Sequence, residues 1–333
     1  MKTVYLVTGA YGHLGNAVVK KLLENNCSVR AFAIESDKEK SVFGDTIETI
    51  FGDIRKIDDL EKLFVFDYQC EKIVIHLAGI VSIASKFNQD IYDVNVGGTK
   101  NVVALCKKYK VKKLVHISSV HAIPEPKNGG IITEVSHFDP NDVTGLYAKT
   151  KSEATQAVLD SVSCGLDASV IHPSGIFGPF DNGKGHLTQL VIDFMNGSLF
   201  ASVKGGYDFV DVRDVADGIF ACIEKGKKGE CYILSNKYFE ICEILRILHK
   251  ITGKKDVKLV IPMWLAKFTA PLSEYYYKLK KQPPLYTAYS LYTLSSNAIF
   301  SHEKASKELG FSTRPMEDTL ADTVSWILNK NHA

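Results

Sequence analysis

A tyrosine and a lysine stand four residues apart in the segment YAKTK, at Tyr147 and Lys151. In a helix, residues at this spacing share one face, so the lysine ammonium can lie near the phenol. Hydride transfer to a carbonyl leaves an alkoxide that must be protonated, and the reverse reaction needs a base. A tyrosine with a pKa of about 10 serves either purpose better when a nearby cation lowers that pKa. The pair therefore indicates acid–base catalysis of hydride transfer.

A serine upstream of this pair is a third catalytic candidate. The apolar segment Lys112–Ile117 is typical of a buried strand and ends in Ser118 and Ser119. At the carboxyl end of a strand, the Ser119 hydroxyl is placed to hydrogen-bond the same substrate oxygen. Four other tyrosine–lysine pairs have the same spacing, so spacing alone proves nothing: Tyr68/Lys72, Tyr109/Lys113, Tyr276/Lys280 and Tyr277/Lys281. Only Tyr147 and Lys151 follow a serine-ending strand, and we therefore take Ser119, Tyr147 and Lys151 as the catalytic group.

A glycine-rich segment, TGAYGHLG, follows the first predicted strand and opens the first predicted helix. The pyrophosphate of a dinucleotide binds backbone N–H groups at a helix N-terminus, and side chains would block that approach. Gly9 and Gly12 leave this space, and Gly15 lets the helix meet the strand. The alternative is merely a tight turn, but the strand–turn–helix context favours a phosphate cradle.

The elements that position these residues follow from hydrophobic periodicity. The first 175 residues alternate short apolar runs with longer helical ones, which indicates βαβ units and a parallel sheet. The predicted strands are Val4–Thr8, Ser28–Ile34, Ile47–Phe51, Lys72–Leu77, Lys112–Ile117 and Ala168–His172. The predicted helices are Leu14–Glu24, Ile57–Phe66, Ile91–Tyr109 and Leu146–Ser161. The fold class is therefore α/β, a Rossmann-type doubly wound parallel sheet that binds ligands beyond the carboxyl ends of its strands.

The 333 residues suggest two domains, or one large domain that carries an insertion. Residues 1–175 are predicted to form the dinucleotide-binding Rossmann domain, to which residues 207–234 could return. A further strand is expected at Tyr207–Val212. Residues 176–206 and 235–333 are predicted to form a smaller, mostly helical substrate-binding lobe.

Composition excludes several other classes of protein. A formal charge of +2 is too balanced for a surface that binds nucleic acid. The longest uncharged apolar stretch, Ile73–Ser85, has thirteen residues, where a membrane span needs roughly 20. No secretory signal is recognisable either, so we expect a cytoplasmic protein with no membrane partner. Seven scattered cysteines and ten histidines without ligand spacing indicate neither disulfides nor a metal site.

An ordered set of motifs resembles the extended short-chain dehydrogenase/reductase superfamily, which includes the NAD-dependent epimerase/dehydratase family. These motifs are TGAYGHLG (8–15), GDI (52–54), HLAG (76–79), VNVGGT (94–99), HISS (116–119), YAKTK (147–151), HPSGIFGP (172–179) and DFVDVRDVADG (208–218). The resemblance implies a nicotinamide cofactor, the Ser/Tyr/Lys catalytic group matched above, and a homodimer through the helices at Ile91–Tyr109 and Leu146–Ser161.

The same resemblance implies the residues around the cofactor. It places Asp53 and Ile54 at the adenine, residues 77–79 beside the ribose and pyrophosphate, and Pro173 and Ile176 at the nicotinamide, with Asn95 bracing the central helix. The full set of cofactor-binding candidates is Gly9, Tyr11, Gly12, His13, Leu14, Gly15, Asp53, Ile54, Leu77, Ala78, Gly79, Asn95, Tyr147, Lys151, Pro173 and Ile176.

The choice between NAD and NADP stays open, with a slight lean to NAD. A 2′-phosphate calls for arginine or lysine just beyond the second strand, and a free 2′-hydroxyl is usually held by an acid there. The positions where the family carries these residues hold Ala33 and Ile34. Glu35 would repel a phosphate, whereas Lys38 or Lys40 would attract one.

The substrate is expected to be a small, fairly apolar ketone or secondary alcohol. HPSGIFGP resembles the dihydroflavonol-reductase-like and 3β-hydroxysteroid-dehydrogenase-like branch. Sugar-nucleotide members carry an arginine before the segment DFVDV, where this chain has Gly206 and Tyr207. No arginine occurs between Arg246 and Arg314 to grip a diphosphate. The first alternative is a nucleotide-sugar epimerase or dehydratase with tightly bound NAD. The second, less favoured alternative is a non-catalytic dinucleotide-sensing regulator.

Two further features bear on the substrate pocket. Aromatic residues gather between Pro262 and Ile299, and we expect them to serve packing or dimer contact more than a pocket: Trp264, Phe268, Tyr275, Tyr276, Tyr277, Tyr286, Tyr289 and Tyr292. His121 is a candidate to face the substrate from the mouth of its strand. His76, His116 and His172 are expected to be hydrogen-bonded core residues.

Overall fold

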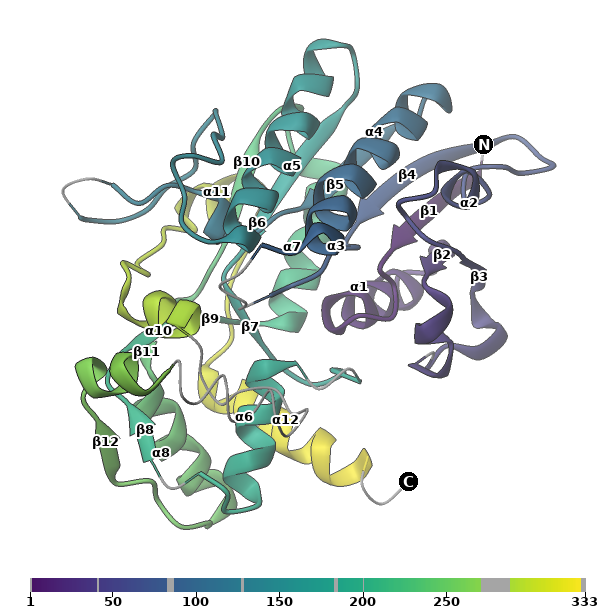
Figure 1. Cartoon of the computed structure of the whole chain (residues 1–333). Coiled ribbons are helices and arrows are strands. Elements are labelled where there is room, and N and C mark those ends of the chain that lie inside the picture. Colours follow the sequence, from purple (N-terminus) through teal and green to yellow (C-terminus); the bar gives the residue numbers. More distant parts are fainter. Residues whose placement is uncertain are drawn as a thin grey trace.

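Seven parallel strands form the central sheet of the computed structural model, in the spatial order β10-β6-β5-β4-β1-β2-β3 (Figure 1). The structure describes residues 2–40, 42–82, 87–126, 129–182, 185–199, 201–270 and 288–330. The strands are β1 (Lys2–Thr8), β2 (Ser28–Ala33), β3 (Glu48–Phe51), β4 (Cys70–His76), β5 (Lys113–Ile117), β6 (Ala168–Pro173) and β10 (Cys231–Leu234). The predicted doubly wound α/β fold is confirmed, and its seventh strand, β10, pairs with β6.

Helices cover both faces of this sheet, which explains why its central strands are apolar almost throughout. On one face lie α4 (Thr99–Lys108) and α5 (Leu146–Ser163), where Val102 and Val158 join Leu114 of β5 in one core cluster. On the other face lie α1 (His13–Glu24), α7 (Val212–Lys225) and α11 (Glu303–Leu309), as Figure 1 shows. In β5 every side chain is buried, as two covered faces require.

Two predicted helices differ in the structure. The segment predicted as a helix over Ile91–Tyr109 is helical, but it contains a π-helical turn, Asp93–Gly98, between α3 (Gln89–Tyr92) and α4. A side chain at Gly98 would come within 2.8 Å of Ile54, so the wider turn brings the backbone close to its neighbour at that point. The second helix, α2, covers only Ile57–Glu61 instead of extending to Phe66.

The second lobe is built from small sheets and four longer helices. One sheet joins β7 (Gly175–Phe177), β9 (Gly206–Asp211) and β11 (Lys237–Glu240), and the other joins β8 (Ala201–Val203) and β12 (Leu259–Ile261). The helices are α6 (His186–Met195), α8 (Ile241–Thr252), α10 (Ala288–Ser295) and α12 (Met316–Lys330), with a further helical stretch over residues 263–270. No helix among the described residues is both long and apolar enough to cross a bilayer.

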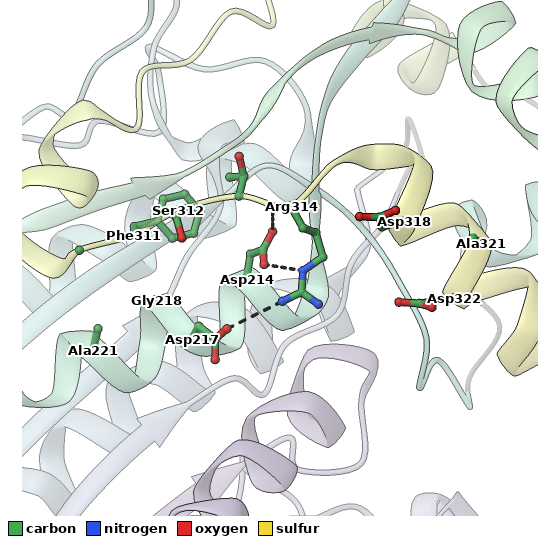
Figure 2. A pocket seen from close by; sticks show the side chains of 12 residues that line it. Asp214, Asp217, Gly218, Ala221, Phe311, Ser312, Arg314, Asp318, Ala321 and Asp322 are labelled. Atoms are coloured by element: carbon green, nitrogen blue, oxygen red, sulfur yellow. Dashed lines mark hydrogen bonds and ion pairs between the residues drawn. The ribbon is translucent and has the colours of Figure 1, made fainter.

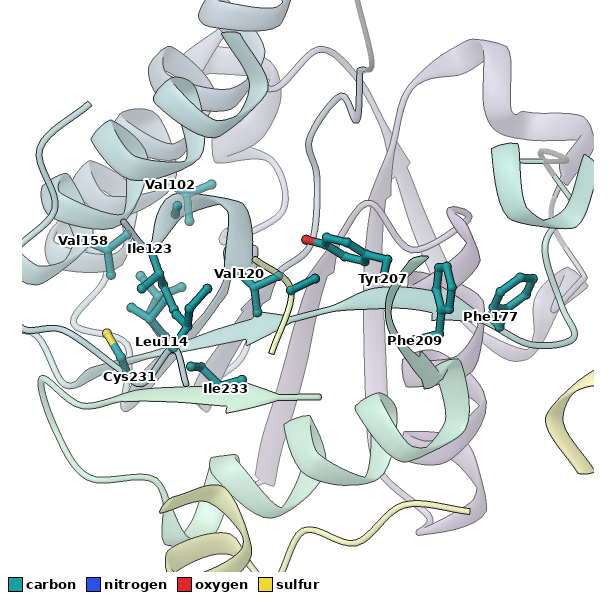
Figure 3. Packing of buried hydrophobic residues seen from close by; sticks show 14 of the residues in the cluster. Val102, Leu114, Val120, Ile123, Val158, Phe177, Tyr207, Phe209, Cys231 and Ile233 are labelled. Atoms are coloured by element: carbon teal, nitrogen blue, oxygen red, sulfur yellow. The ribbon is translucent and has the colours of Figure 1, made fainter. Parts of the chain in front are cut away.

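Residues 206–234 connect the two lobes. Strand β9 belongs to the three-stranded sheet of the second lobe. Helix α7, which follows it, packs on the seven-stranded sheet, and β10 is the edge strand of that sheet. The rings of Phe177 and Phe209 lie edge to face at 5.0 Å between centroids, and the apolar core continues from them through Tyr207 to β5 and β10 (Figure 3). The lobes therefore share one continuous core.

An arginine fastens the C-terminal segment to α7. Arg314 donates from Nε to Asp214 at 2.7 Å, and its backbone N–H donates to the same carboxylate at 2.8 Å. Figure 2 shows the guanidinium between Asp214 and Asp217, at the wall of a cavity of about 580 Å³. This cavity lies on the α7 side of the sheet, opposite the α5 face that carries Tyr147 and Lys151.

We expect Arg314→Met to lower the free energy of unfolding by about 2 kcal/mol, because it leaves the buried Asp214 carboxylate without its cation. Arg314 retains 28% side-chain exposure, which reduces the effect below that of a fully buried pair. Lys307→Met is the matched control, since its pair with Glu303 is exposed to solvent and should contribute almost nothing. Urea denaturation followed by circular dichroism measures both, and equal effects of the two substitutions would contradict this role of Arg314.

Candidate functional site

The carboxyl ends of β1, β4 and β5 meet at one edge of the central sheet. The glycine-rich turn follows β1, residues 77–80 follow β4, and Ser118 and Ser119 follow β5. The first two turns of α5 add Tyr147 and Lys151 at the same edge. Topology thus brings both predicted motifs to the position where doubly wound sheets bind ligands.

The three positions of the turn carry glycine for different physical reasons. Gly9 has a φ of +71°, and a side chain there would meet the Ala78 backbone nitrogen at 2.7 Å. A side chain at Gly15 would lie 2.1 Å from the Gly9 carbonyl, so strand and helix pack too closely for one. At Gly12 a side chain would meet only that carbonyl, at 3.4 Å, an ordinary contact. Packing of the protein itself therefore requires glycine at 9 and 15, whereas Gly12 leaves open space.

That open space lies at the N-terminus of α1. Gly12 is the N-cap and supplies no side-chain acceptor, and no acidic residue stands in the first turn. No acidic residue of the helix's own first turn therefore balances the positive end of its dipole. His13 and Asn16 tie the turn to the other lobe, with His13 Nε2 at 3.0 Å from the Pro179 carbonyl and Asn16 donating to the Phe180 carbonyl at 3.1 Å. These features fit the pyrophosphate of a dinucleotide.

The three catalytic candidates are all buried in the protein. The Ser119 hydroxyl accepts a hydrogen bond from the His121 backbone N–H at 3.2 Å and also contacts the Tyr147 phenol. Burial raises the pKa of Tyr147 to about 12, and the hydrogen bond with Ser119 opposes this in part. The pKa of Tyr147 is thus set by desolvation of the phenolate and by Ser119, and the lowering expected from Lys151 stays a prediction.

Lys151 points toward the loop after β4 and the end of β5. Its ammonium donates to the Ile117 carbonyl at 2.9 Å, and a side chain at Gly79 would lie 3.3 Å from Nζ. Burial lowers the pKa of Lys151 to about 8. Because Ala78 adjoins Gly9, the short segment Ala78–Gly79 links the glycine turn to the lysine.

Asn95 joins this loop to α5. Its side chain accepts from the Ile80 N–H at 2.8 Å and donates to the Ile80 carbonyl at 3.1 Å. It also donates to the Thr150 hydroxyl at 3.1 Å, one residue before Lys151. Asn95 therefore has the geometry of a brace between loop and helix.

Sequence reasoning correctly placed three histidines in the core, but it did not predict that they form one polar layer beneath this site. His76 and His116 are paired in register on β4 and β5, with ring centroids 5.1 Å apart, and His172 occupies the end of β6. His172 donates from Nδ1 to the Ser119 carbonyl at 2.9 Å. The available signal was that HLAG, HISS and HPSG each carry a histidine where a predicted strand ends.

The hydrogen bonds of His76 form an ordered chain. Thr99 donates its hydroxyl to the Asn95 carbonyl at 2.6 Å, so His76 Nε2, at 2.9 Å, must donate to Thr99. His76 Nδ1 then accepts from Thr8 at 2.7 Å. His116 differs from expectation, because neither of its buried ring nitrogens has a partner within the described chain. Burial lowers the pKa of His76 to about 3, so the layer is uncharged at neutral pH.

The remaining cofactor candidates surround the turn. The Tyr11 hydroxyl lies 2.6 Å from the Thr49 hydroxyl and its ring is buried beside β3. Asp53 is held by Arg55 at 2.7 Å, and Ile54 is buried in the core. Of the others, Leu14, Leu77 and Ile176 are partly buried against the core on the α1 side of the sheet, and Pro173 ends β6.

The residues that bear on NAD against NADP follow β2. Ile34 is exposed, and the side chains of Lys38 and Lys40 lie outside the described residues.

A cavity of about 200 Å³ lies beside the turn that follows Ser119 and is lined by Val120 and His121, but not by Ser119 or Tyr147 themselves. His121 lines it with its ring 6.0 Å from that of Tyr147, and the Tyr207 hydroxyl lies 3.2 Å from His121 Nε2. Burial lowers the pKa of His121 to about 4.

Of the predicted aromatic cluster, only Tyr292 lines this cavity among the described side chains. Trp264 and Phe268 are exposed and not core, and the side chains at 275, 276, 277, 286 and 289 are outside the described residues.

Several known proteins are similar to this chain. It is 30% identical to sterol demethylase protein B of Methylococcus capsulatus, over 96% of this chain and 97% of that protein. It is 28% identical to a putative dihydroflavonol 4-reductase of Synechocystis sp., over 100% and 96%. The solved structure of gox2253 is 29% identical, covers 98% of both chains and has a TM-score of 0.83. The UDP-glucose 4-epimerase of Thermotoga maritima, 20% identical with a TM-score of 0.76 over 98% and 99%, shares the fold.

A family model decides the assignment. The model of the NAD dependent epimerase/dehydratase family matches residues 5–235, which include the glycine turn, Ser119, Tyr147 and Lys151. Several relatives are named as reductases, in agreement with the nicotinamide chemistry predicted from the sequence. The chain therefore belongs to the NAD dependent epimerase/dehydratase family, within the extended short-chain dehydrogenases/reductases, and is an NAD(P)-dependent oxidoreductase.

Proposed function

We propose that this enzyme transfers hydride between a nicotinamide dinucleotide and a carbonyl or secondary alcohol on a small, fairly apolar molecule. The observation that carries the proposal is the joint burial of Ser119, Tyr147 and Lys151 at the sheet edge that also holds the glycine turn. Burying three polar side chains costs free energy, and buried polar groups with shifted pKa values cluster at functional sites.

The cofactor, when bound, supplies or accepts the hydride at its nicotinamide ring. The N-terminus of α1 and Gly12 would hold its pyrophosphate, and Ala78 and Gly79 line the path toward Lys151. With Glu35 beyond β2, we propose NAD in preference to NADP. We also propose that the enzyme is a homodimer through α4 and α5.

Tyr147 acts as the general acid in reduction. Its raised pKa keeps the phenol protonated at neutral pH, so it can donate a proton to the substrate oxygen as that oxygen gains charge. The Ser119 hydroxyl, already beside the phenol, orients the same oxygen. The Lys151 ammonium favours the tyrosinate that remains. In oxidation the same groups act in reverse.

The cavity at His121, whose ring lies 6.0 Å from that of Tyr147, favours an uncharged substrate, and its lining combines polar and apolar side chains. Val120, Ile123 and Phe300 contribute apolar surface, and the charged residues that line it among those described are Glu125 and Asp142. Two carboxylates would repel the diphosphate of a nucleotide sugar, which disfavours the epimerase alternative. The relatives agree: they include a sterol demethylase protein and a ketoreductase named for a farnesylated quinoline oxide. We propose that His121, neutral at pH 7, contacts the substrate there.

We predict that Tyr147→Phe binds the cofactor but turns over at least ~100-fold more slowly, because the proton donor is lost. The assay is the change in absorbance of NADH or NADPH on adding ketones, steroids, flavonoids or nucleotide sugars. Tyr109→Phe is the matched control, since Tyr109 has a lysine at the same spacing but donates to Glu61 on a helix remote from the site. Near-normal turnover by Tyr147→Phe, or conversion of a nucleotide sugar without net change in NADH, would overturn the proposal.

The pH dependence of reduction should follow Lys151. Its pKa of about 8 means that the ammonium is charged below that pH and is lost as the pH rises through it. We therefore expect kcat/KM to fall above about pH 8, while the phenol of Tyr147, with its higher pKa, adds no second fall. In Lys151→Arg, whose guanidinium stays charged, activity is lower but the fall should disappear. An unchanged alkaline fall in Lys151→Arg would show that another group titrates.

A further inference from the structure

The helical stretch over residues 263–270 exposes its large apolar side chains and buries its small ones. Ala266 and Ala270 are completely buried against Leu291 of α10, whereas Trp264 is 71% exposed and Phe268 is 74% exposed. A surface helix normally shows the opposite arrangement, with large apolar residues on the core face. Trp264 and Phe268 are four residues apart and so share one outward face, which Leu265 extends.

The preceding strand enlarges this apolar surface. Leu259 and Val260 of β12 are exposed, and Pro262 leads directly from this strand into the helical stretch. The five side chains Leu259, Val260, Trp264, Leu265 and Phe268 are here called the outer patch. Exposed apolar patches of this kind mark interaction sites more often than chance surface residues do.

Lysines are concentrated in the segment that carries the outer patch. Residues 250–270 contain five lysines against one acidic residue, a net charge of +4, although the whole chain carries only +2. Lys254, Lys255, Lys258 and Lys267 are exposed, and no ion pair joins them to a carboxylate in the described part of the chain. The remainder of the molecule is therefore net negative, and the charge is concentrated beside the patch.

We propose that the outer patch docks on the surface of an anionic lipid bilayer. Exposed tryptophan, phenylalanine and leucine side chains flanked by lysines have the composition of an interfacial membrane-binding surface, in which the aromatics enter the headgroup region. The lysines complement the negative charge of anionic lipids. A second copy of this chain is a poorer occupant, because a two-fold contact would bring lysines against lysines. The absence of a spanning helix does not bear on such peripheral contact, so this proposal revises the expectation of no membrane partner.

The position of the patch relates it to the substrate. The helical stretch packs through Ala266 on α10, and α10 also contributes Tyr292 to the cavity beside His121. A docked bilayer would therefore lie next to one wall of the cavity. From this we infer that the enzyme takes apolar substrate from the bilayer, an inference that rests on the proposed function, whereas docking itself does not.

Sedimentation of the full chain with vesicles tests the docking. We expect it to bind vesicles of phosphatidylcholine mixed with phosphatidylglycerol, to bind pure phosphatidylcholine far less, and to dissociate as salt rises. Trp264→Ser/Phe268→Ser and, separately, Lys258→Glu/Lys267→Glu should each weaken binding at least ~10-fold. Tyr68→Ser, which removes an exposed aromatic on the other lobe, should bind like the wild type. Because all these side chains are exposed, the variants should unfold at the wild-type urea concentration.

Two further readouts separate the possible outcomes. In a Trp326→Phe background, emission from Trp264 should shift to shorter wavelength on anionic vesicles and not on neutral ones. Wild-type binding by Trp264→Ser/Phe268→Ser would overturn the proposal, as would self-association that this variant abolishes, since a second copy would then cover the patch.

For substrate supply, the same variant should reduce a water-soluble ketone at the wild-type rate but a vesicle-bound ketone several-fold more slowly. If the variant and the wild type reduce the vesicle-bound ketone at equal rates, the inference about substrate supply is refuted. If the wild type is inactive toward every ketone, the proposed function is refuted and the docking proposal is unaffected.

Discussion

The close approach of two backbone segments at the sheet edge controls the geometry of this enzyme. The turn after β1 touches the loop after β4 at Gly9 and Ala78, and the next residue, Gly79, touches Lys151. A side chain at Gly9 would strike the Ala78 backbone at 2.7 Å, so it could not be added without moving a strand; at Gly79 it would meet the side-chain ends of Asn95 and Lys151, at 3.2 and 3.3 Å. The sheet thus fixes the position of the glycine turn relative to the loop that Lys151 contacts, which would hold the proposed nucleotide cradle close to the proposed catalytic lysine.

Beneath this edge lies a buried polar layer, itself uncharged, whose hydrogen bonds fix the geometry of the site. The chain from Thr8 through His76 to Thr99 fixes one imidazole tautomer, and His172 holds the backbone at Ser119. Burial favours the neutral form of every group in the layer, which explains the lowered pKa of Lys151 and the raised pKa of Tyr147. The free enzyme therefore has a protonated phenol, as reduction of a carbonyl requires.

Much of this arrangement was predictable from sequence, because parallel strands covered on both faces leave long apolar runs and the glycine turn follows the first of them. The order of motifs correctly indicated the family, the sheet and the elements that carry Ser119, Tyr147 and Lys151. The π-helical turn at Asp93–Gly98 was not predictable, since it depends on the approach of Gly98 to Ile54, a contact distant in sequence. The burial that raises the pKa of Tyr147 was not predicted for a similar reason, because helical spacing indicates a nearby cation but says nothing of burial. Trp264 and Phe268 were expected to serve packing or dimer contact, and only the packing of Ala266 on α10 reveals that they face outward and not into the core.

The central claim is that the open space at Gly12 receives a dinucleotide, and calorimetric titration of Gly12→Ala with NADH and NADPH tests it most directly. The structure has room for this methyl group, with its nearest protein atom at 3.4 Å, so folding should be unaffected. Our account predicts that the variant unfolds at the wild-type urea concentration yet binds the dinucleotide at least ~10-fold more weakly, because the methyl group obstructs the approach of pyrophosphate to the helix N-terminus. Unchanged affinity in the folded variant would contradict the account.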